Sequence, residues 1–438
     1  MKLRITRHLA FLFSLIFLFG ALSSAAQGSG SDSAGGEKKL QFVLYLSRHG
    51  VRSPTGKTKQ YNQYSAAPWP EWSVQPGYLT AHGYQLMKLF GAYDREKLAA
   101  DGLLSAQGCA DAAHVTIVAD SDQRTRETGK AVAEGMFPGC AVPVQAQAEG
   151  TDDPLFHALH AGVSQADKAL AAAAIAGRIG GDANNLTEAY RPQLEALDRI
   201  LAGCGPAVPA QSRISILSIP ATLEAGSGDH PAALRGPLAV ASTLSENLLL
   251  EYTEGMKGAD LGWGCLDEAK LRFALQLHAA AAEFSERTPA IARLYAANLL
   301  TTIVKSLEQS ATGKPVAGAL GKPGDRVLFL SGHDTNIATV AAALGLTWII
   351  DGRHNDTPPG GALVFELLRS QGDEGFSVRV SYTAQTLDQM RNAIPLTLAM
   401  PPDRVPVFVP GCSGANDACG WSAFQSTVRA VVDAGSIK

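Results

Sequence analysis

Residues 41–55 read QFVLYLSRHGVRSPT, an apolar run that ends in two arginines on either side of a histidine. The apolar part predicts a buried strand over 42–46. Guanidinium groups such as those of Arg48 and Arg52 are planar and permanently charged, and they match the oxygens of a phosphate two at a time. A neutral imidazole such as that of His49 can attack the phosphorus that they hold. We therefore expect a phosphate pocket with a nucleophile at the end of this strand.

Two further strand-like segments also end in charged side chains. Residues 114–119 run into Asp120 and Arg124, and a later segment runs into His333 and Asp334. In open parallel sheets the ligand crevice lies outside the carboxyl ends of the strands, so we expect the three strand ends to meet. For one strand end alone, a packed or solvated histidine is the ordinary alternative. Three arginines, two histidines and two aspartates together favour an anion site with acid–base capability.

The chemistry of phosphoryl transfer assigns roles to these residues. The reaction needs a nucleophile, for which we choose His49, and a proton for the departing alcohol, for which we choose Asp334. Asp334 can act in this way if its acid form is retained, which favours turnover at low pH; helix capping is its structural alternative. Asp120 is expected to cap a helix or to hold an arginine. The predicted phosphate ligands are Arg48, Arg52, Arg124 and His333.

The amino-terminal sequence predicts a secretory signal over 1–26. Three basic residues precede an apolar stretch, 9–22, that is shorter than the ~20 residues of a membrane span, and small residues follow at 24–26. An uncleaved anchor is the alternative. We expect cleavage after Ala26, a flexible lead-in over 27–39, and a mature protein in the periplasm or outside the cell. Removal of 1–26 takes away three positive charges and no acids from a net charge of −4.

Composition limits the possible partners. An acidic chain without a basic tail is a poor nucleic-acid binder, so any anionic ligand must be held by locally clustered arginine and lysine. No segment after the signal predicts a membrane span. We expect a small phosphorylated substrate, no nucleic acid, no membrane after signal cleavage, and a monomer.

All six cysteines lie after the predicted signal, and an even number in an exported chain favours disulfides. None lies in a Cys-x-x-Cys pair, so a zinc site or a redox motif has little support. Cys412 and Cys419 flank a short loop of glycine, asparagine and aspartate, and we expect them to close it. Spacing alone leaves the connectivity of the other four open.

Periodicity predicts the organisation of the rest of the chain. Strand-like and helix-like segments alternate in the first third, which predicts a mostly parallel central sheet flanked by helices. Helical periods dominate 150–310, including one helix over 186–202, and we interpret this region as a large, mostly helical inserted domain. The sheet resumes after it. The expected fold is therefore an α/β domain of 40–149 and 311–438 with a helical cap of 150–310.

The run RHGVRSPT at 48–55 together with HDTN at 333–336 resembles the histidine acid phosphatases, the second branch of the histidine phosphatase superfamily. The resemblance is to bacterial periplasmic phytases and acid phosphatases in particular, and it extends through ADSDQRTR at 119–126 and DTPPGG at 356–361. It implies an α/β domain and a mostly helical domain with the site between them, and no metal or cofactor. It also implies the roles given above for each matching residue. Together with the order of the cysteines in the chain, it implies the disulfides Cys109–Cys140 and Cys204–Cys265.

The resemblance also suggests a substrate pocket. Glu246 matches a helical-domain acid that faces the pocket in phytases, although a solvated helix glutamate is the alternative. Thr55, Lys57 and Thr335 are further candidates for this pocket. His-Asp-Thr is seen in phytase-like members and His-Asp-Ser in glucose-1-phosphatase relatives, which favours phytate, inositol hexakisphosphate. Gly56 separates Thr55 from Lys57, whereas a lysine commonly follows the threonine directly in phytases.

The expected function is therefore an acid phosphomonoesterase with a phosphohistidine intermediate, a phytase. A broad-specificity acid phosphatase or a glucose-1-phosphatase is the main alternative. A phosphoglycerate mutase shares the Arg-His-Gly motif, but the signal, the cysteines and the helical insertion argue against it. A non-catalytic periplasmic binding protein would use the same arginines but would not need His49 or Asp334 as proton-active groups.

Overall fold

The strand predicted from the opening stretch lies within the central sheet. The computed structural model describes residues 38–204, 213–228, 230–370, 375–414 and 416–435, so the predicted signal lies outside the described residues. Strand β1 (Lys38–Arg48) pairs in parallel with β6 (Val327–Gly332) and antiparallel with β9 (Ala362–Ser370). It begins at Lys38, so the last two residues of the predicted lead-in, 27–39, belong to the sheet and not to a flexible segment.

The sheet has a parallel part and an antiparallel part. Its strand order is β11-β10-β9-β1-β6-β2-β3, and β12 pairs with β10. The pairs β1–β6, β6–β2 and β2–β3 are parallel, whereas the strands on the other side of β1 are antiparallel. The remaining bounds are β2 (Val115–Ala119), β3 (Val144–Gln145), β10 (Phe376–Ala384), β11 (Asp403–Val407) and β12 (Ala418–Gly420). The expected α/β fold with a central sheet flanked by helices is confirmed.

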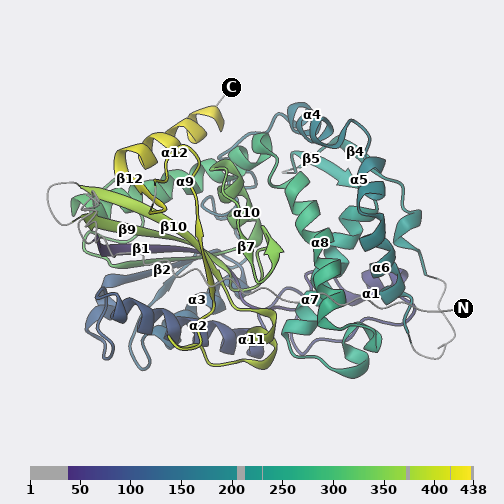
Figure 1. Ribbon diagram of the computed structural model, residues 1–438, viewed down its shortest axis with the longest axis horizontal. Helices are drawn as coiled ribbons and strands as arrows, with labels where there is room; N and C mark the ends of the chain where they lie inside the picture. Colours follow the sequence, from purple (N-terminus) through teal and green to yellow (C-terminus); the bar gives the residue numbers. More distant parts are fainter. Residues whose placement is uncertain (1–37, 205–212, 229, 371–374, 415, 436–438) are drawn as a thin grey trace, which may run out of the picture. The chain divides into compact units, whose positions relative to one another are not determined.

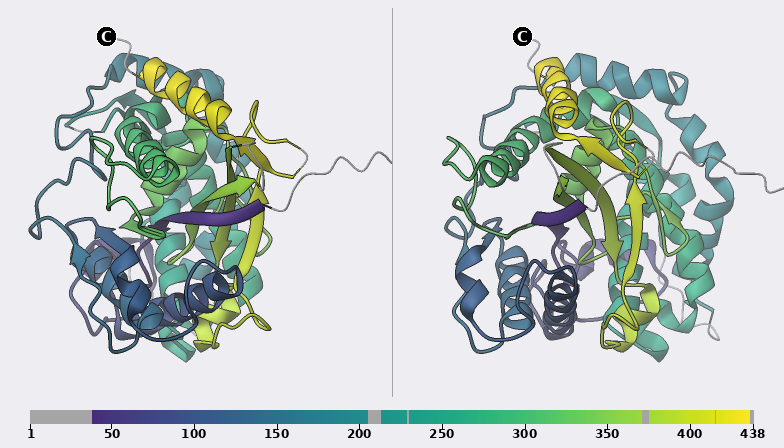
Figure 2. Two further views of the ribbon diagram at one scale, coloured as in Figure 1. Left: turned by 90° about the vertical axis from the view of Figure 1, so that its left-hand side faces the viewer. Right: turned by 60° about the vertical axis from the view of Figure 1, so that its left-hand side comes forward.

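Helices cover both faces of the sheet, which is why β1 is a continuous apolar run without alternation. Leu44 and Leu46 of β1 join a core cluster with α9 (Pro289–Thr312), α10 (Asp334–Ala343) and α12 (Trp421–Gly435). Val43 and Tyr45 point to the opposite face and join a cluster with α2 (Ala81–Ala100) and α3 (Gln123–Met136). Figures 1 and 2 show α12 and α2 on opposite sides of the sheet.

A third core cluster lies among the helices of the chain's middle (Figure 1). These helices are α4 (Lys168–Ile179), α5 (Asn184–Ala189), α6 (Arg191–Leu201), α7 (Pro237–Thr253) and α8 (Glu268–Ser285). The single helix expected over 186–202 is two helices, because Pro192 lies at the start of α6. A proline has no N–H to donate, and it disfavours helical geometry in the residue before it.

Short elements connect these layers. The hairpin of β4 (Thr222–Ala225) and β5 (Ala232–Arg235) lies within the helical region and has no counterpart in the prediction. The other short elements are α1 (Thr58–Tyr61), α11 (Leu387–Asn392), β7 (Ile349–Ile350), β8 (Arg353–His354), and the 3₁₀ turns Asn62–Tyr64, Ala110–His114, Ile216–Ser218, Gly258–Asp260 and Gly262–Gly264. Among the described residues, every helix is too short or too polar to cross a bilayer.

The structure forms the three expected disulfides. Their pairs are Cys109–Cys140, Cys204–Cys265 and Cys412–Cys419. The first joins the segment before β2 to the end of α3, and the second joins the end of α6 to the segment before α8. The third closes the loop before β12. The first two bridges join segments outside the sheet, whereas Cys419 of the third lies in β12, opposite Val378 of β10.

Candidate active site

The ends of β1, β2 and β6 lie next to one another, as the three charged strand ends require. The backbone N–H of His49 donates to the carbonyl of Gly332 at 2.9 Å, and that of Asp120 donates to the carbonyl of Ser331 at 3.0 Å. A cavity of about 390 Å³ opens there, which we call the strand-end cavity. The predicted site residues that line it are His49, Arg52, Arg124, His333, Asp334 and Thr335.

His49 is held in one tautomer. Its Nδ1 lies 2.8 Å from the carbonyl oxygen of Gly50, which can only accept, so Nδ1 carries the proton and Nε2 carries the lone pair. Burial lowers the pKa of His49 well below its usual value, and the guanidinium groups of Arg124 and Arg52 lower it further. The imidazole is therefore neutral. None of the described residues hydrogen-bonds Nε2.

Gly50 is needed behind the nucleophile. A Cβ atom at this position would lie 2.8 Å from the side chain of Met87 and 3.0 Å from the carbonyl oxygen of Gly83, both on α2. Its N–H also donates to the hydroxyl of Thr128 on α3 at 2.9 Å. The missing side chain thus lets the loop pack directly on two helices, which fixes the position of His49.

Arg48 and Arg52 share a carboxylate from the helical region. Arg48 is fully buried; its Nη1 donates to the carbonyl of Thr357 at 2.7 Å, and its Nη2 contacts both Glu246 and Asp334. Burial alone would lower the pKa of Arg48, but the two carboxylates outweigh it and raise that pKa. Arg52 Nη2 lies 3.2 Å from Glu246 Oε1. The glutamate on α7 is therefore an ion-pair partner of both arginines and not a solvated helix residue.

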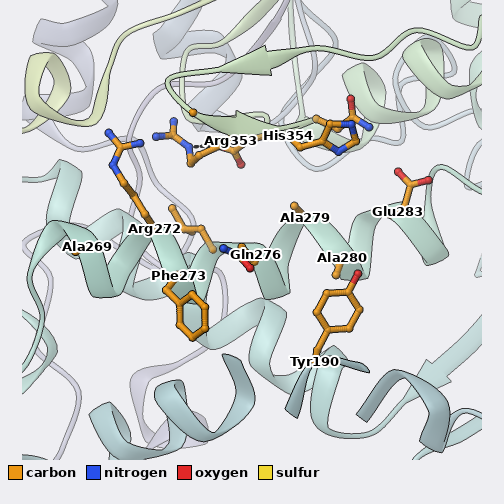
Figure 3. Close-up of a pocket in the computed structure, with 14 residues that line it drawn as sticks. Tyr190, Ala269, Arg272, Phe273, Gln276, Ala279, Ala280, Glu283, Arg353 and His354 are labelled. Atoms are coloured by element: carbon orange, nitrogen blue, oxygen red, sulfur yellow. Dashed lines mark hydrogen bonds and ion pairs between the residues drawn. The ribbon is translucent and has the colours of Figure 1, made fainter. Parts of the chain in front are cut away.

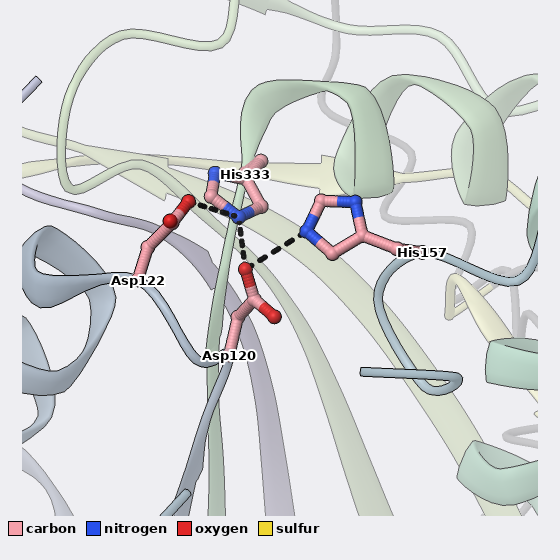
Figure 4. Close-up of side chains that lie close together, drawn as sticks. All are labelled: Asp120, Asp122, His157 and His333. Carbon is pink, nitrogen blue, oxygen red and sulfur yellow. Dashed lines mark hydrogen bonds and ion pairs between the residues drawn. The ribbon is translucent and has the colours of Figure 1, made fainter. Parts of the chain in front are cut away.

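Asp120 holds two histidines, which differs from the expected helix cap or arginine partner. Its Oδ2 lies 2.6 Å from His333 Nε2 and 2.9 Å from His157 Nε2 (Figure 4). Burial alone would raise the pKa of Asp120, but the hydrogen bonds from His157 and His333 outweigh it and hold that pKa well below its usual value. The same contact with Asp120 raises the pKa of His157. His157 follows the DPLF run at 153–156, but nothing in that pattern indicates that its side chain reaches this site.

Arg124 completes the group around His333. Its Nη2 lies 3.4 Å from His333 Nδ1 and 2.6 Å from Asp122 Oδ2. Because a guanidinium only donates, Nδ1 accepts and Nε2–H faces Asp120. Burial lowers the pKa of His333, although the hydrogen bond to Asp120 opposes this. As arranged, His333 is neutral, and it needs a second proton before Nδ1 can donate to a phosphate.

The same group offers ligand atoms for a cation. One atom each of Asp120, Asp122, His157 and His333 lies within 4.8 Å of the others. An imidazole must lose the proton on its ligating nitrogen before it binds a metal. Here the Nε2 proton of His333 lies in the hydrogen bond to Asp120, so the arrangement as it stands is a proton-bridged cluster.

Asp334 is the first residue of α10, and the N-cap position belongs to His333, whose backbone N–H donates to Asn336 Oδ1 at 2.9 Å. Asp334 Oδ1 accepts from the backbone N–H of Thr335 at 2.9 Å, so the carboxylate also binds a free N–H of the first helical turn. Asp334 Oδ2 lies 3.0 Å from Arg48 Nη2, and a quarter of the side chain is exposed (25%). Burial alone would raise the pKa of Asp334, but Arg48 and other cations nearby outweigh it and hold that pKa well below its usual value. With these neighbours Asp334 is a carboxylate.

The remaining pocket candidates divide into two groups. Thr335 lines the strand-end cavity, and its hydroxyl lies 3.4 Å from Oε1 of Glu286, a lining residue that the sequence did not indicate. Thr55 and Lys57 are exposed and lie outside the cavity lining, on the segment that leads into α1. The sequence around Glu286 gives no signal, because a glutamate at the end of a helix is ordinarily solvated.

A second cavity, which we call the helix-α8 cavity, has about 550 Å³ and lies between α8 and the β7–β8 segment (Figure 3). Each of its arginines is already paired with two acids. Arg272 contacts Glu268 and Asp351, and Arg353 contacts Asp351 and Asp356. We therefore do not assign an anion site to it.

Comparison with known proteins gives relatives along nearly the whole chain. The family model of the histidine phosphatase superfamily, branch 2, matches residues 39–200 and 261–383. Phytase AppA of Escherichia coli K12 is 38% identical over 403 residues, 90% of this chain and 92% of that protein. Glucose-1-phosphatase of Salmonella typhimurium is 31% identical over 413 residues, 93% of this chain and 95% of that protein.

Solved structures agree with these relatives. The phytase of Hafnia alvei in complex with tartrate superposes with a TM-score of 0.81 at 35% identity, over 91% of this chain and 98% of that one. The phytase of Citrobacter braakii superposes with a TM-score of 0.81 at 32% identity, over 90% and 98%. With its strand ends, histidines and arginines arranged as described, the chain belongs to the histidine phosphatase superfamily, branch 2.

Proposed function

We propose that this phosphoric monoester hydrolase forms a phosphohistidine on His49 and that its substrate is phytate. The observation that carries the proposal is the state of His49. It is a buried, neutral imidazole whose Nδ1–H is tied to the Gly50 carbonyl, while Nε2 lies in a cavity lined by Arg52 and Arg124. A nucleophile for phosphorus needs this lone pair, and the phosphate needs those cations.

The reaction has two steps. The lone pair of His49 Nε2 forms a bond to phosphorus while the bond from phosphorus to the ester oxygen breaks, and the leaving oxygen takes a proton from Asp334. Water then attacks the phosphohistidine, the P–N bond breaks, and Asp334 takes the water proton. The carbonyl of Gly50 stabilises the positive charge that develops on the ring, because it accepts from Nδ1–H. Arg48, Arg52, Arg124 and a protonated His333 are the proposed phosphate ligands.

Two relatives favour different substrates. Phytase AppA is 38% identical and glucose-1-phosphatase of Salmonella typhimurium 31%, and Thr335 follows Asp334 as in phytase-like members. These observations support phytate over glucose 1-phosphate. Glucose-1-phosphatase is the second candidate, since that relative covers 93% of this chain. Thr55 and Lys57 do not line the cavity as it stands, so they are proposed as contacts for the outer phosphates only.

Three further proposals concern the protein as a whole. The signal at 1–26 exports it to the periplasm or the medium, and it acts as a monomer. Its α/β part, 40–149 and 311–438, and its helical part, 150–310, are two domains. The three disulfides support export, and the separate core cluster of α4–α8 supports the division into two domains.

The test is phosphate release by the purified mature protein at about pH 4–5 with a chelator present. Phytate and glucose 1-phosphate are compared side by side, with His49→Ala as the control. A preference for phytate that the variant loses supports the proposal. A preference for glucose 1-phosphate, or equal use of many monoesters, would agree with the proposed mechanism and would overturn the proposal that phytate is the substrate. Phosphate binding without release would support the non-catalytic binding protein.

A further inference from the structure

The proposed proton donor does not hold a proton in the strand-end cavity as it stands. Asp334 is ion-paired with Arg48 at 3.0 Å, and its pKa is held low by that cation and its neighbours. A carboxylate cannot protonate a leaving group. The cavity must therefore contain another source for this proton, or take one from solvent during each turnover.

A second carboxyl group opens into the same cavity. Glu286 follows directly on α8 and lines the cavity together with His49 and Asp334. Its Oε1 accepts from the hydroxyl of Thr335 at 3.4 Å, and Thr335 is the neighbour of Asp334 in the chain. This distance is long for a hydrogen bond, so the contact between Glu286 and Thr335 stabilises the fold little.

The charges around Glu286 leave it without a cation. Arg48 Nη2 contacts Glu246 and Asp334, and Arg52 contacts Glu246. Among the described residues, no lysine or arginine forms an ion pair with Glu286. Burial raises the pKa of Glu286 to about 8, and the charge of Asp334 contributes in the same direction. The neutral acid is thus the stable form of Glu286 while Asp334 is ionised.

The groups that face Glu286 come from several elements. They are Asp334 and Thr335 on α10, Glu246 on α7, Arg48 on β1 and Arg287 beside it, with Arg52, Tyr295 and His230 also lining the cavity. His278 of α8 lies next to Asp334 and Glu246, with one ligand atom of each within 4.8 Å of the others. Acids that interact this closely titrate as a pair and not as separate sites. When the arginines bind a phosphate dianion, the negative charge of the phosphate offsets their positive charge, and they no longer keep Asp334 ionised. The proton that Glu286 and Asp334 share can then lie on Asp334.

We propose that Glu286 supplies the proton that Asp334 gives to the leaving group, a role that rests on the proposed function. When the phosphate ester binds, the Glu286 carboxyl loses its proton and the Asp334 carboxylate gains one. As the P–O bond breaks, the leaving oxygen takes this proton from Asp334. In the second step water loses a proton to Asp334 as its oxygen bonds to phosphorus, and the proton returns to Glu286. Glu286 therefore acts through Asp334, as a positioning residue, and does not touch the reacting atoms.

The kinetic test uses Glu286→Gln, which keeps the shape and the acceptor for Thr335 but cannot release a proton. Rates are measured from about pH 3.5 to 8 on glycerol 2-phosphate, whose alkoxide must be protonated, and on p-nitrophenyl phosphate, whose leaving group scarcely needs it. We expect kcat on glycerol 2-phosphate to fall about 10- to 100-fold above about pH 5 and less below it. We expect kcat on p-nitrophenyl phosphate to change less than about 3-fold.

Two controls separate this role from a structural one. Glu268→Gln removes a carboxylate at the start of α8 that pairs with Arg272 outside the strand-end cavity, and its pH profile should match the wild type. In an Asp334→Asn background, Glu286→Gln should cause no further loss, because the proton no longer has a recipient. Equal losses on both substrates at every pH, an unchanged profile, or additive effects in the double variant would each overturn the proposal.

A binding measurement decides the matter even if the chain proves inactive. Inorganic phosphate is titrated calorimetrically near pH 5 in buffers of different ionisation enthalpy, which gives the number of protons taken up on binding. In the wild type the proton moves internally from Glu286 to Asp334, whereas in Glu286→Gln it must come from the buffer. The variant should therefore take up as much as one proton more. Equal uptake would overturn the proposal, while loss of turnover in the wild type would overturn only the proposed function.

Discussion

The strand-end cavity and the helix-α8 cavity both contain arginines and acids, but most of their ion pairs differ in how far apart the partners lie in the sequence. In the helix-α8 cavity three of the four ion pairs among the described residues are local: Arg353 contacts acids two and three residues away, and Arg272 contacts one four residues away and one 79 residues away. At the strand-end cavity Arg48 and Arg52 contact an acid that is 198 and 194 residues away, and of its described arginines only Arg124 pairs locally, with Asp122. An ion pair between residues close in sequence forms as soon as that segment folds. Distant pairing exists only when the whole fold is in place.

This difference separates charged side chains that stabilise the fold from charged side chains that can bind a ligand. Each arginine of the helix-α8 cavity has two carboxylate partners, so an anion would have to displace them. The strand-end cavity brings Arg52 and Arg124 together with a neutral histidine and with Glu286, which has no ion-pair cation among the described residues. Arg52 and Arg124 have one carboxylate partner each, so a phosphate meets fewer competing acids there. Variants that remove charge from one cavity or the other should therefore behave differently.

The largest effect is expected for His49→Ala. Because no other described side chain offers a neutral imidazole tied to the Gly50 carbonyl, turnover should fall by at least about 10⁴-fold on every monoester. Binding of inorganic phosphate should persist, since the arginines remain. Stopped assays and calorimetry measure the two properties. Substantial turnover in this variant would move the nucleophile elsewhere.

Asp334→Asn should have the next largest effect and should depend on the leaving group. We expect kcat on glycerol 2-phosphate to fall about 10²- to 10³-fold, because the alkoxide leaves without its proton. On p-nitrophenyl phosphate the loss should stay below about 10-fold. The ratio of the two rates is the measurement. An unchanged ratio would show that Asp334 is not the donor.

Arg353→Met tests the cavity with local pairing. Asp351 and Asp356 lose a buried cation, and a carboxylate left without its partner should lower the free energy of unfolding by about 3 kcal/mol. The kcat/KM on p-nitrophenyl phosphate should stay within about 2-fold, because no strand-end residue loses a contact. Urea unfolding with the disulfides intact gives the first value. A large loss of kcat/KM with normal stability would give the helix-α8 cavity a role in function.

Glu251→Gln extends the comparison to a buried carboxyl group that forms no ion pair with an arginine of the described residues. Glu251 is buried on α7 and accepts from the Gly262 N–H, and burial raises its pKa to about 8 from an ordinary 4.5. The neutral acid therefore stabilises the fold below about pH 4.5, and this contribution is lost as the pH rises through about 8. Glutamine mimics the neutral acid at every pH. We expect no change in unfolding free energy at about pH 4 and a gain of roughly 4 kcal/mol at about pH 8, from urea unfolding. A gain of equal size at both values would contradict the burial argument.

The sequence predicts the strand ends well and their neighbours poorly. The apolar runs at 42–46, 114–119 and 325–330 each end in charged residues, and the rule for parallel sheets is enough to bring them together. The same rule says nothing of which side chain of a later helix meets them. His157 and Glu286 were missed for this reason, since a histidine in a loop and a glutamate at a helix end carry no pattern of their own.

Local competition explains the other differences. The helix expected over 186–202 divides at Tyr190, two residues before Pro192, whose missing N–H outweighs the apolar periodicity on both sides. Asp334 was expected as a cap or a proton donor; the N-cap position is taken by His333, and Asp334 accepts from the Thr335 N–H and pairs with Arg48. In both cases the residue types were identified correctly, and the contact that prevailed came from a neighbour one or two positions away.

The place of β1 in the sheet has a consequence for how the protein is made. β1 spans Lys38–Arg48, yet its two neighbours, β6 and β9, begin at Val327 and Ala362. A chain emerging from the ribosome therefore carries an apolar strand with neither partner until most of its length has been synthesised. Helices such as α2 and α3 can pack together early, but the nucleophile is positioned only when the carboxyl-terminal third arrives. A nascent chain released before residue 327 would contain His49 and both flanking arginines and still have no catalytic site.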